Sequence, residues 1–133
     1  MMKRISGPFS VKVLPQKADN PQAEAAGLGR MALDKQFHGD LEATSQGEML
    51  SVLDRSTGSG GYVAMERVTG ILAGKRGSFV LMHQATMARG NPEMAIAVVP
   101  DSGTEELSGL RGTMEIRIED KQHFYDFDYE FGS

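Results

Sequence analysis

Glu66 and His83 are the two side chains of this sequence whose types and spacing best support chemistry. They lie in the segment 61–87, which alternates apolar and polar residues on both sides of Gly74-Lys75. If Gly74-Lys75 is the two-residue loop of a hairpin, with glycine at its first position, Glu66 is directly opposite His83. Both side chains then point to an otherwise apolar face. The sequence therefore predicts a Glu–His pair inside the fold.

Such a pair has three possible roles. A carboxylate and an imidazole in an apolar cavity can act as general acid and base, for example in an isomerisation. They can also anchor the polar end of a small apolar ligand. Most simply, they satisfy one another as a buried structural pair. A bulge at Lys75 or Arg76 would shift the register and place Glu66 opposite Gln84 instead.

The side chains expected to line a ligand-binding lumen come from this hairpin and from the last strand. They are Tyr62, Glu66, Phe79, Leu81, His83, Met87, Tyr125 and Tyr129. Glu66 and His83 are also the candidate catalytic residues. On the predicted register Phe79 lies across from Gly70, where an aromatic ring covers a bare backbone. The pattern does not decide whether Glu48 and Arg67 face the lumen.

Several other kinds of site are disfavoured. The chain has no cysteine, which removes disulfides, thiolate nucleophiles and cysteine-based zinc sites. The three histidines, His38, His83 and His123, lack the spacing of a zinc site. The GSGG run at 58–61 lacks the lysine and the following helix of a phosphate-binding loop, and no Gly-x-Ser-x-Gly elbow occurs. We therefore expect no metal and no other cofactor.

Period-two alternation between turn signals runs from one end of the chain to the other and predicts strands throughout. Eight strands are expected, at 5–14, 28–38, 41–53, 62–73, 78–88, 94–100, 113–119 and 123–131. The connections 15–27 and 101–112 are each expected to hold a short helical turn, capped by Asn20 and Thr104 respectively. Leu107 and Leu110 would then plug an opening in the sheet.

The last hairpin tests this period. With Asp120-Lys121 as its loop, one face is apolar and aromatic and the other is charged, with Arg117 diagonal to Asp126. Meandering strands with one apolar face hide that face and their edges by closing into a barrel. The predicted fold is an all-β, closed antiparallel eight-stranded barrel, forming a single domain over residues 1–133. A two-sheet sandwich is the alternative, but it usually needs longer crossing connections.

Composition narrows the classes of partner. A net charge of −4, with scattered Lys and Arg, argues against nucleic acid and anionic membranes. The longest apolar run, 94–100, is too short to cross a bilayer, and no signal peptide is visible. We expect a soluble cytoplasmic protein. A homodimer is the default assembly, with a higher homo-oligomer also considered, because symmetric dimers are the commonest.

The run GTEELSGLRG at 103–112 is similar to a glycine-rich signature of allene oxide cyclase and dirigent-type barrels. More closely, the chain resembles a bacterial single-domain family of unknown function with an allene-oxide-cyclase-like barrel. The matching pieces include FHGDLEATSQGEML (37–50), GYVAMERVTG (61–70), GSFVLMHQATM (77–87), VVPDSGTEELSGLRGTMEIRIED (98–120) and HFYDFDYEF (123–131). A departure is Gln84-Ala85, where similar chains would carry a glycine.

This resemblance implies a self-associating antiparallel barrel and no activity, because the family has none assigned. Cyclase or dirigent function does not transfer, since no catalytic residue of those enzymes matches residue by residue. We expect the barrel to bind a small, mostly apolar molecule in its lumen. The alternatives are an isomerase- or cyclase-like enzyme that uses Glu66 and His83, and a structural oligomer with a packed lumen.

Overall fold

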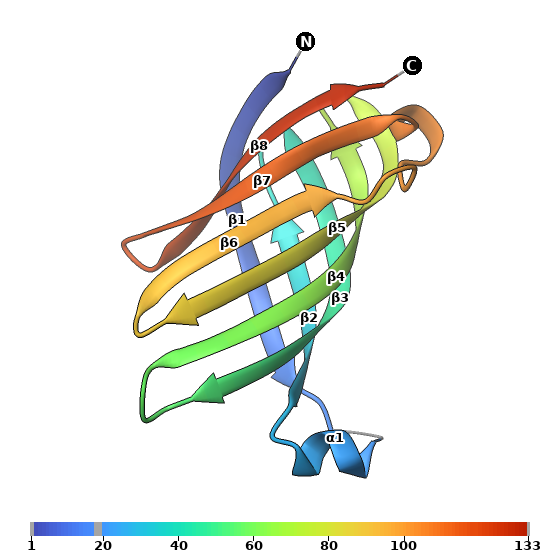
Figure 1. Ribbon diagram of the computed structural model, residues 1–133. Helices are drawn as coiled ribbons and strands as arrows, with labels where there is room; N and C mark the ends of the chain where they lie inside the picture. The colour runs from blue at the N-terminus through green and yellow to red at the C-terminus, as the bar shows by residue number, and fades with distance from the viewer. Residues whose placement is uncertain (1, 18–19, 133) are drawn as a thin grey trace.

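The computed structural model describes residues 2–17 and 20–132, and they form one closed barrel (Figure 1). Each strand pairs antiparallel with its neighbours in sequence, and the last strand pairs with the first. The strands are β1 (Lys3–Pro15), β2 (Gly29–Phe37), β3 (Leu41–Asp54), β4 (Ser59–Leu72), β5 (Lys75–Ala88), β6 (Asn91–Val98), β7 (Leu110–Glu119) and β8 (Gln122–Phe131). The predicted all-β closed antiparallel barrel is confirmed.

The helix α1 (Pro21–Ala25) connects β1 to β2 and lies below the barrel in Figure 1. The side chain of Asn20 accepts hydrogen bonds from the backbone N–H groups of Gln22 and Ala23, as predicted for its cap. Gly27 follows with φ of 82°, a conformation that glycine adopts without strain.

The 3₁₀ helix η1 (Glu105–Leu107) lies in the connection from β6 to β7. Thr104 precedes it, but its hydroxyl accepts a hydrogen bond from the Ser78 backbone N–H at 3.0 Å and makes no cap bond to the helix. The predicted plug is present, because Leu107 and Leu110 are both buried in the core. This connection therefore closes one end of the barrel.

The pairing register of β4 and β5 differs from its prediction by two residues, because the loop begins one residue earlier. The loop is Ala73-Gly74, not Gly74-Lys75, and both loop residues have positive φ, at 47° and 87°. Positive φ at both positions is characteristic of a type I′ turn, whose twist matches that of the strands. An alanine in the left-handed region is uncommon, so the sequence pointed to the wrong pair of loop residues.

The shift changes every predicted cross-strand pair but keeps each side chain on its predicted face, because side-chain direction alternates with a period of two. Glu66 lies across from Leu81, and His83 lies across from Ala64. Phe79 lies across from Val68, so the predicted covering of Gly70 by a directly opposite Phe79 is wrong.

The last hairpin has the predicted Asp120-Lys121 loop, with Glu119 paired to Gln122. Both loop residues again have positive φ, at 49° and 67°. Arg117 donates to Asp126 at 2.7 Å, which is the predicted diagonal charge pair.

The core fills one half of the barrel with aromatic and aliphatic side chains. Phe79 stacks on Phe127 with ring centroids 5.8 Å apart, and Phe127 stacks on Tyr129 at 5.3 Å. The hydroxyl of Tyr125 donates to the backbone oxygen of His38 at 2.7 Å and accepts from the backbone N–H of Leu41 at 3.1 Å. This half of the lumen is packed solid.

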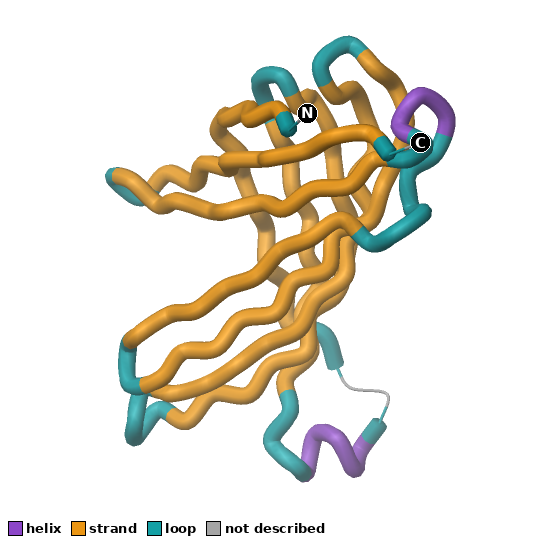
Figure 2. Tube along the Cα trace, turned by 45° about the horizontal axis from the view of Figure 1, so that its top comes forward, coloured by secondary structure: helices purple, strands orange, loops and turns teal. Residues whose placement is uncertain are grey.

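The other half is open, because β6 and β7 separate. Only Ile96–Met114 and Ala97–Thr113 pair between the described residues of these strands. Figure 2 shows the β5–β6 and β7–β8 hairpins diverging from one another. Three inward-facing side chains near the separation, Met87, Met94 and Ile118, are exposed to solvent. The barrel therefore has a closed end and an open end.

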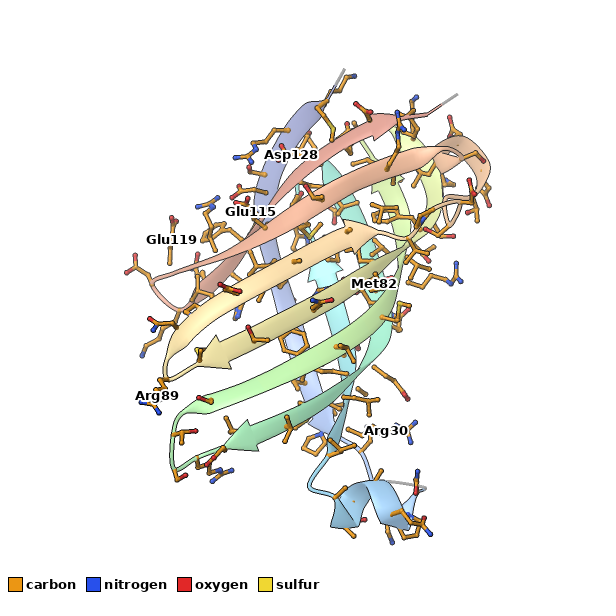
Figure 3. All side chains as sticks on the ribbon, in the orientation of Figure 1. Arg30, Met82, Arg89, Glu115, Glu119 and Asp128 are labelled. Atoms are coloured by element: carbon orange, nitrogen blue, oxygen red, sulfur yellow. The ribbon has the colours of Figure 1, made fainter. Side chains whose placement is uncertain are left out.

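The outer face is charged over β1, β7 and β8. Arg4 donates twice to Asp128, each time at 2.8 Å, and Arg111 donates to Glu130 at 2.9 Å. Glu115, Glu119 and Asp128 mark this face in Figure 3. The acidic residues of β8 are thus matched by arginines from the strands beside it.

The outer face is apolar over β3, β4 and β5. About half of each side chain of Leu50, Val63, Met65 and Met82 is exposed there, and Met82 is labelled in Figure 3. These four residues form an outer apolar patch on the side of the sheet that faces away from the lumen. Arg67 also points outward, and Glu48 pairs with Arg30 at 2.7 Å on the same face. The sequence pattern left open whether Glu48 and Arg67 face the lumen, and in the structure neither does.

The Ala73-Gly74 turn generates a stability prediction. Gly74→Ala should lower the free energy of unfolding by about 1 kcal/mol, because alanine is strained in the left-handed region. No atom lies within 4 Å of a Cβ built at Gly74, so a steric clash would not confuse the result. Urea unfolding measures the effect, with Ala73→Gly as the control that should not destabilise. An unchanged stability for Gly74→Ala would contradict this turn.

Candidate functional site

Four polar side chains meet inside the barrel at the boundary between its packed and open halves. Lys35 Nζ lies 2.8 Å from Glu66 Oε2, and His83 Nε2 lies 3.4 Å from the same oxygen. Ser45 is the cross-strand neighbour of Lys35. The four residues are between 0 and 6 % exposed. We call Lys35, Ser45, Glu66 and His83 the polar cluster.

The strands bring these side chains together by simple alternation. On β2, Met31, Leu33, Lys35 and Phe37 all point inward, so Lys35 occupies a core position between two apolar residues. Its ammonium group also lies 5.5 Å from the centroid of the Phe9 ring. The sequence reading missed Lys35, because a lysine in a strand is usually exposed. The alternation of β2 was the signal that could have found it.

Gly47 lets β3 approach β4 closely beside Glu66. It is the neighbour of Glu66 on β3, and a Cβ built at this glycine would lie 2.7 Å from the Glu66 Cβ and 2.2 Å from the backbone oxygen of Met65. A side chain at this position would therefore push β3 away from Glu66.

The polar cluster is short of hydrogen bonds. Among the described residues, Ser45 Oγ, both carboxylate oxygens of Glu66 and His83 Nε2 have no hydrogen-bond partner of normal geometry. The ion contacts of Lys35 and His83 are close but not aligned as hydrogen bonds. Buried polar groups are nearly always satisfied, and an unsatisfied one costs roughly 1–3 kcal/mol. The cluster therefore has unused capacity to bind a further polar group.

Burial and charge act in opposite directions on Glu66. Burial raises the pKa of the Glu66 carboxyl group, while the contacts with His83 and Lys35 lower it by more, so its pKa lies below the usual range. Burial also raises the pKa of the half-buried Tyr62 hydroxyl, and the nearby negative charge of Glu66 raises it further. Glu66 is thus ionised and Tyr62 is neutral at neutral pH.

A pocket of about 290 Å³ lies on the open side of the polar cluster. Apolar side chains form most of its wall, including Met49, Ala85, Met87 and Met94. Tyr62 also lines it, and Tyr62 and Ala85 each lie two residues along their strands from Ala64 and His83, which face one another. His83 therefore lies one layer of side chains, about 7 Å, below the floor of this pocket, and Glu66, four residues from Tyr62 along β4, lies one layer deeper.

The predicted lumen residues divide between the two halves of the barrel. Tyr62 and Met87 line the pocket, and Glu66 and His83 belong to the polar cluster. The other four, Phe79, Leu81, Tyr125 and Tyr129, are buried in the packed core. The structure thus brings Glu66 and His83 together, diagonally instead of directly opposite, and adds Lys35 and Ser45 beside them.

The remaining histidines lie apart from this cluster. His38 Nδ1 lies 3.1 Å from Glu42 Oε2 in an exposed contact, and His123 lies 5.3 Å from the Phe9 ring. Within residues 2–17 and 20–132 no three His, Asp or Glu side chains are grouped to hold a metal ion. No helix in the same residues is long and apolar enough to span a bilayer.

The same fold and sequence pattern occur in other proteins. The family profile DUF3224, a family of proteins of unknown function, matches residues 5–129. The chain belongs to the DUF3224 family. A crystal structure of a DUF3224 protein of unknown function from Shewanella oneidensis MR-1 is 50 % identical, with a TM-score of 0.93, and the match covers 100 % of this chain and 99 % of that one. Among curated proteins, none matches the chain.

Membership of DUF3224 confirms the resemblance to a family of unknown function and brings no activity with it. The reading of the barrel as allene-oxide-cyclase-like stays a prediction. The function of this DUF3224 protein therefore has to be argued from the polar cluster and the pocket above it.

The buried ion pair generates a second prediction. Lys35→Met should lower the free energy of unfolding at pH 7 by roughly 3–5 kcal/mol, because it leaves the Glu66 charge buried without its partner. The double variant Lys35→Met/Glu66→Met should recover most of that loss. Urea unfolding of the three proteins measures the coupling. Additive losses in the double variant would show that the two side chains do not interact.

The pKa of Glu66 generates a third prediction. Because its folded-state pKa lies below the unfolded value of about 4.3, the ionised carboxylate stabilises the fold above that pH. This contribution is lost as the pH falls through the folded-state pKa. The difference in unfolding free energy between the wild type and Glu66→Gln should therefore shrink between pH 7 and pH 3. A difference that stays constant or grows toward pH 3 would contradict the lowered pKa.

Proposed function

We propose that this DUF3224 protein binds a small, mostly apolar molecule, with the body of the molecule in the pocket and its polar end at the polar cluster. One observation carries the proposal: His83 Nε2, a buried polar atom without a hydrogen-bond partner among the described residues, lies one layer of side chains below an apolar pocket that opens to solvent, with Glu66, also without a hydrogen-bond partner, beneath it. Ligand sites in proteins usually combine an apolar wall with a few polar groups that fix orientation.

The wall of the pocket suits an adaptable apolar ligand. Met49, Met87 and Met94 are unbranched and flexible, so they can fit around molecules of differing shape. The separation of β6 from β7 leaves this end of the barrel open, which supplies a route of entry. Burial of apolar ligand surface there would contribute about 25 cal/mol for each Å² removed from water.

The contact between Lys35 and Glu66 supports a role in ligand binding more than a role in catalysis. A general base works best when its pKa lies near the working pH, but the contacts with His83 and Lys35 hold the pKa of Glu66 below its usual range. A carboxylate with that pKa is a weak base. The isomerase alternative, which assigns proton transfer to Glu66 and His83, therefore has less support than ligand anchoring.

The packed-lumen alternative accounts for one half of the molecule. The aromatic core around Phe79 and Tyr125 leaves that half with a structural role. The other half keeps an apolar pocket of about 290 Å³ on its lumen side. We therefore assign stability to the packed half and binding to the open half.

A neutral fluorescent dye, N-phenyl-1-naphthylamine, tests the proposed function. Its fluorescence should rise on titration with the wild-type protein, because the dye moves from water into an apolar pocket. Ala85→Phe places a ring in the pocket wall and should weaken binding at least about tenfold, which corresponds to 1.4 kcal/mol.

The matched control is Met82→Phe, which adds a ring on the same strand but on the outer apolar patch. Thermal melts monitored by circular dichroism establish that both variants fold. The proposal is wrong if the dye does not bind, or if Met82→Phe abolishes binding while Ala85→Phe leaves it intact.

A further inference from the structure

The balance of charge in the polar cluster limits what the ligand can carry at its polar end. This inference rests on the proposed function. Lys35 contributes one positive charge and Glu66 one negative charge, 2.8 Å apart. Each therefore already has its counter-ion within the cluster.

The atoms without partners define the chemistry that is missing. Glu66 Oε2 faces Lys35 Nζ at 2.8 Å, whereas Glu66 Oε1 has no polar partner among the described residues and, as a hydrogen-bond acceptor only, requires a donor. Ser45 Oγ is also without a partner, and a hydroxyl group can either donate or accept. A group that donates one hydrogen bond and accepts another would satisfy Glu66 and Ser45 together.

A carboxylate at the end of the ligand does not meet this requirement. It has no proton to donate, and it would place a second negative charge beside the buried Glu66. An ammonium group can donate, but it would place a second positive charge beside Lys35. In a site removed from water, either uncompensated charge is costly.

A hydroxyl or primary amide group meets it without adding charge. Such a group donates to Glu66 and accepts from Ser45, which leaves the contact between Lys35 and Glu66 in place. A ligand that lacks either of these two hydrogen bonds leaves a buried polar group unpaired and binds more weakly. The site can therefore discriminate strongly between ligands that differ only in the polar end.

Tyr62 lies on the route between the pocket and the cluster. It lines the pocket, it lies near enough to Glu66 for the carboxylate charge to raise the pKa of its hydroxyl, and it is only half-buried. A rotation of this ring about its side-chain torsions is the movement we expect to bring the polar end of a ligand toward the cluster.

We infer that the ligand of this DUF3224 barrel is an apolar molecule with a neutral, hydrogen-bond-donating end, of the alcohol or primary amide class. Fatty acid anions and alkylammonium ions of the same length are excluded by the paired charges of Lys35 and Glu66. The selection is made by Glu66 and Ser45, not by the apolar wall.

Three probes with identical eight-carbon chains test the inference: 1-octanol, octanoate and octylammonium. Each competes with bound N-phenyl-1-naphthylamine at pH 8, where octanoate and octylammonium are charged. We expect 1-octanol to displace the dye at a concentration at least about tenfold lower than either ion. Octanamide should behave like 1-octanol.

Ser45→Ala is the variant that removes one proposed contact without changing charge. It should weaken 1-octanol several-fold relative to octanoate, each compared with the dye affinity of the same variant. Glu66→Gln should improve octanoate at least about tenfold relative to 1-octanol, because the repelling charge is gone. The wild-type comparison alone decides the matter if this variant does not fold.

The proposed function and the inference about the polar end fail in different ways. If the dye does not bind in the pocket, the proposed function fails and this inference fails with it. If the dye binds and octanoate or octylammonium displaces it as well as 1-octanol does, the pocket is real and the inference about the polar end is wrong.

Discussion

The ion pair of Lys35 and Glu66 constrains the whole lumen, because two charges are held out of water between apolar layers. Removing a charged pair from water costs several kcal/mol for each ion, and apolar replacements of similar volume are often as stable or more stable. Stability alone therefore does not account for a lysine and a glutamate at core positions. The proposed binding of a polar group there would give these two charges a role.

The barrel provides the conditions that this pair needs. On one side, the stacked rings around Phe127 and the plug of Leu107 and Leu110 keep water out and hold the strands in register. On the other side, β6 and β7 separate and leave an opening lined by flexible apolar side chains. The polar cluster lies at the boundary between the packed half and the open half of the barrel. A solid lumen would give the cluster no route to a ligand, and a fully open one would expose its charges to water.

Much of this arrangement follows from alternation along the strands. The eight strands, the inward faces of β4, β5, β7 and β8 and the last hairpin were predictable, because a period of two assigns faces without any tertiary information. The register of β4 and β5 was not, because the turn uses Ala73 in a conformation that sequence rules reserve for glycine and asparagine. The error was two residues and therefore left Glu66 and His83 on the correct face.

Lys35 and Ser45 were missed for a different reason. The sequence pattern reads residue types, and a lysine between two apolar positions is normally assigned to solvent. Only the position of Lys35 between Leu33 and Phe37 indicated that it faces inward.

The outer apolar patch on β3, β4 and β5 is the part of the surface best suited to the predicted self-association, which stays a prediction.

A crystal structure of the protein grown with 1-octanol is the most direct test of the central claim, which is that the polar cluster anchors a ligand bound in the pocket. We expect electron density for the octanol chain between Met49 and Ala85, with the hydroxyl oxygen about 3 Å from Glu66 and Ser45. Tyr62 should be rotated away from the cluster. Density for 1-octanol only on the outer apolar patch, or a water molecule alone between Glu66 and Ser45 beneath an unmoved Tyr62, would contradict it.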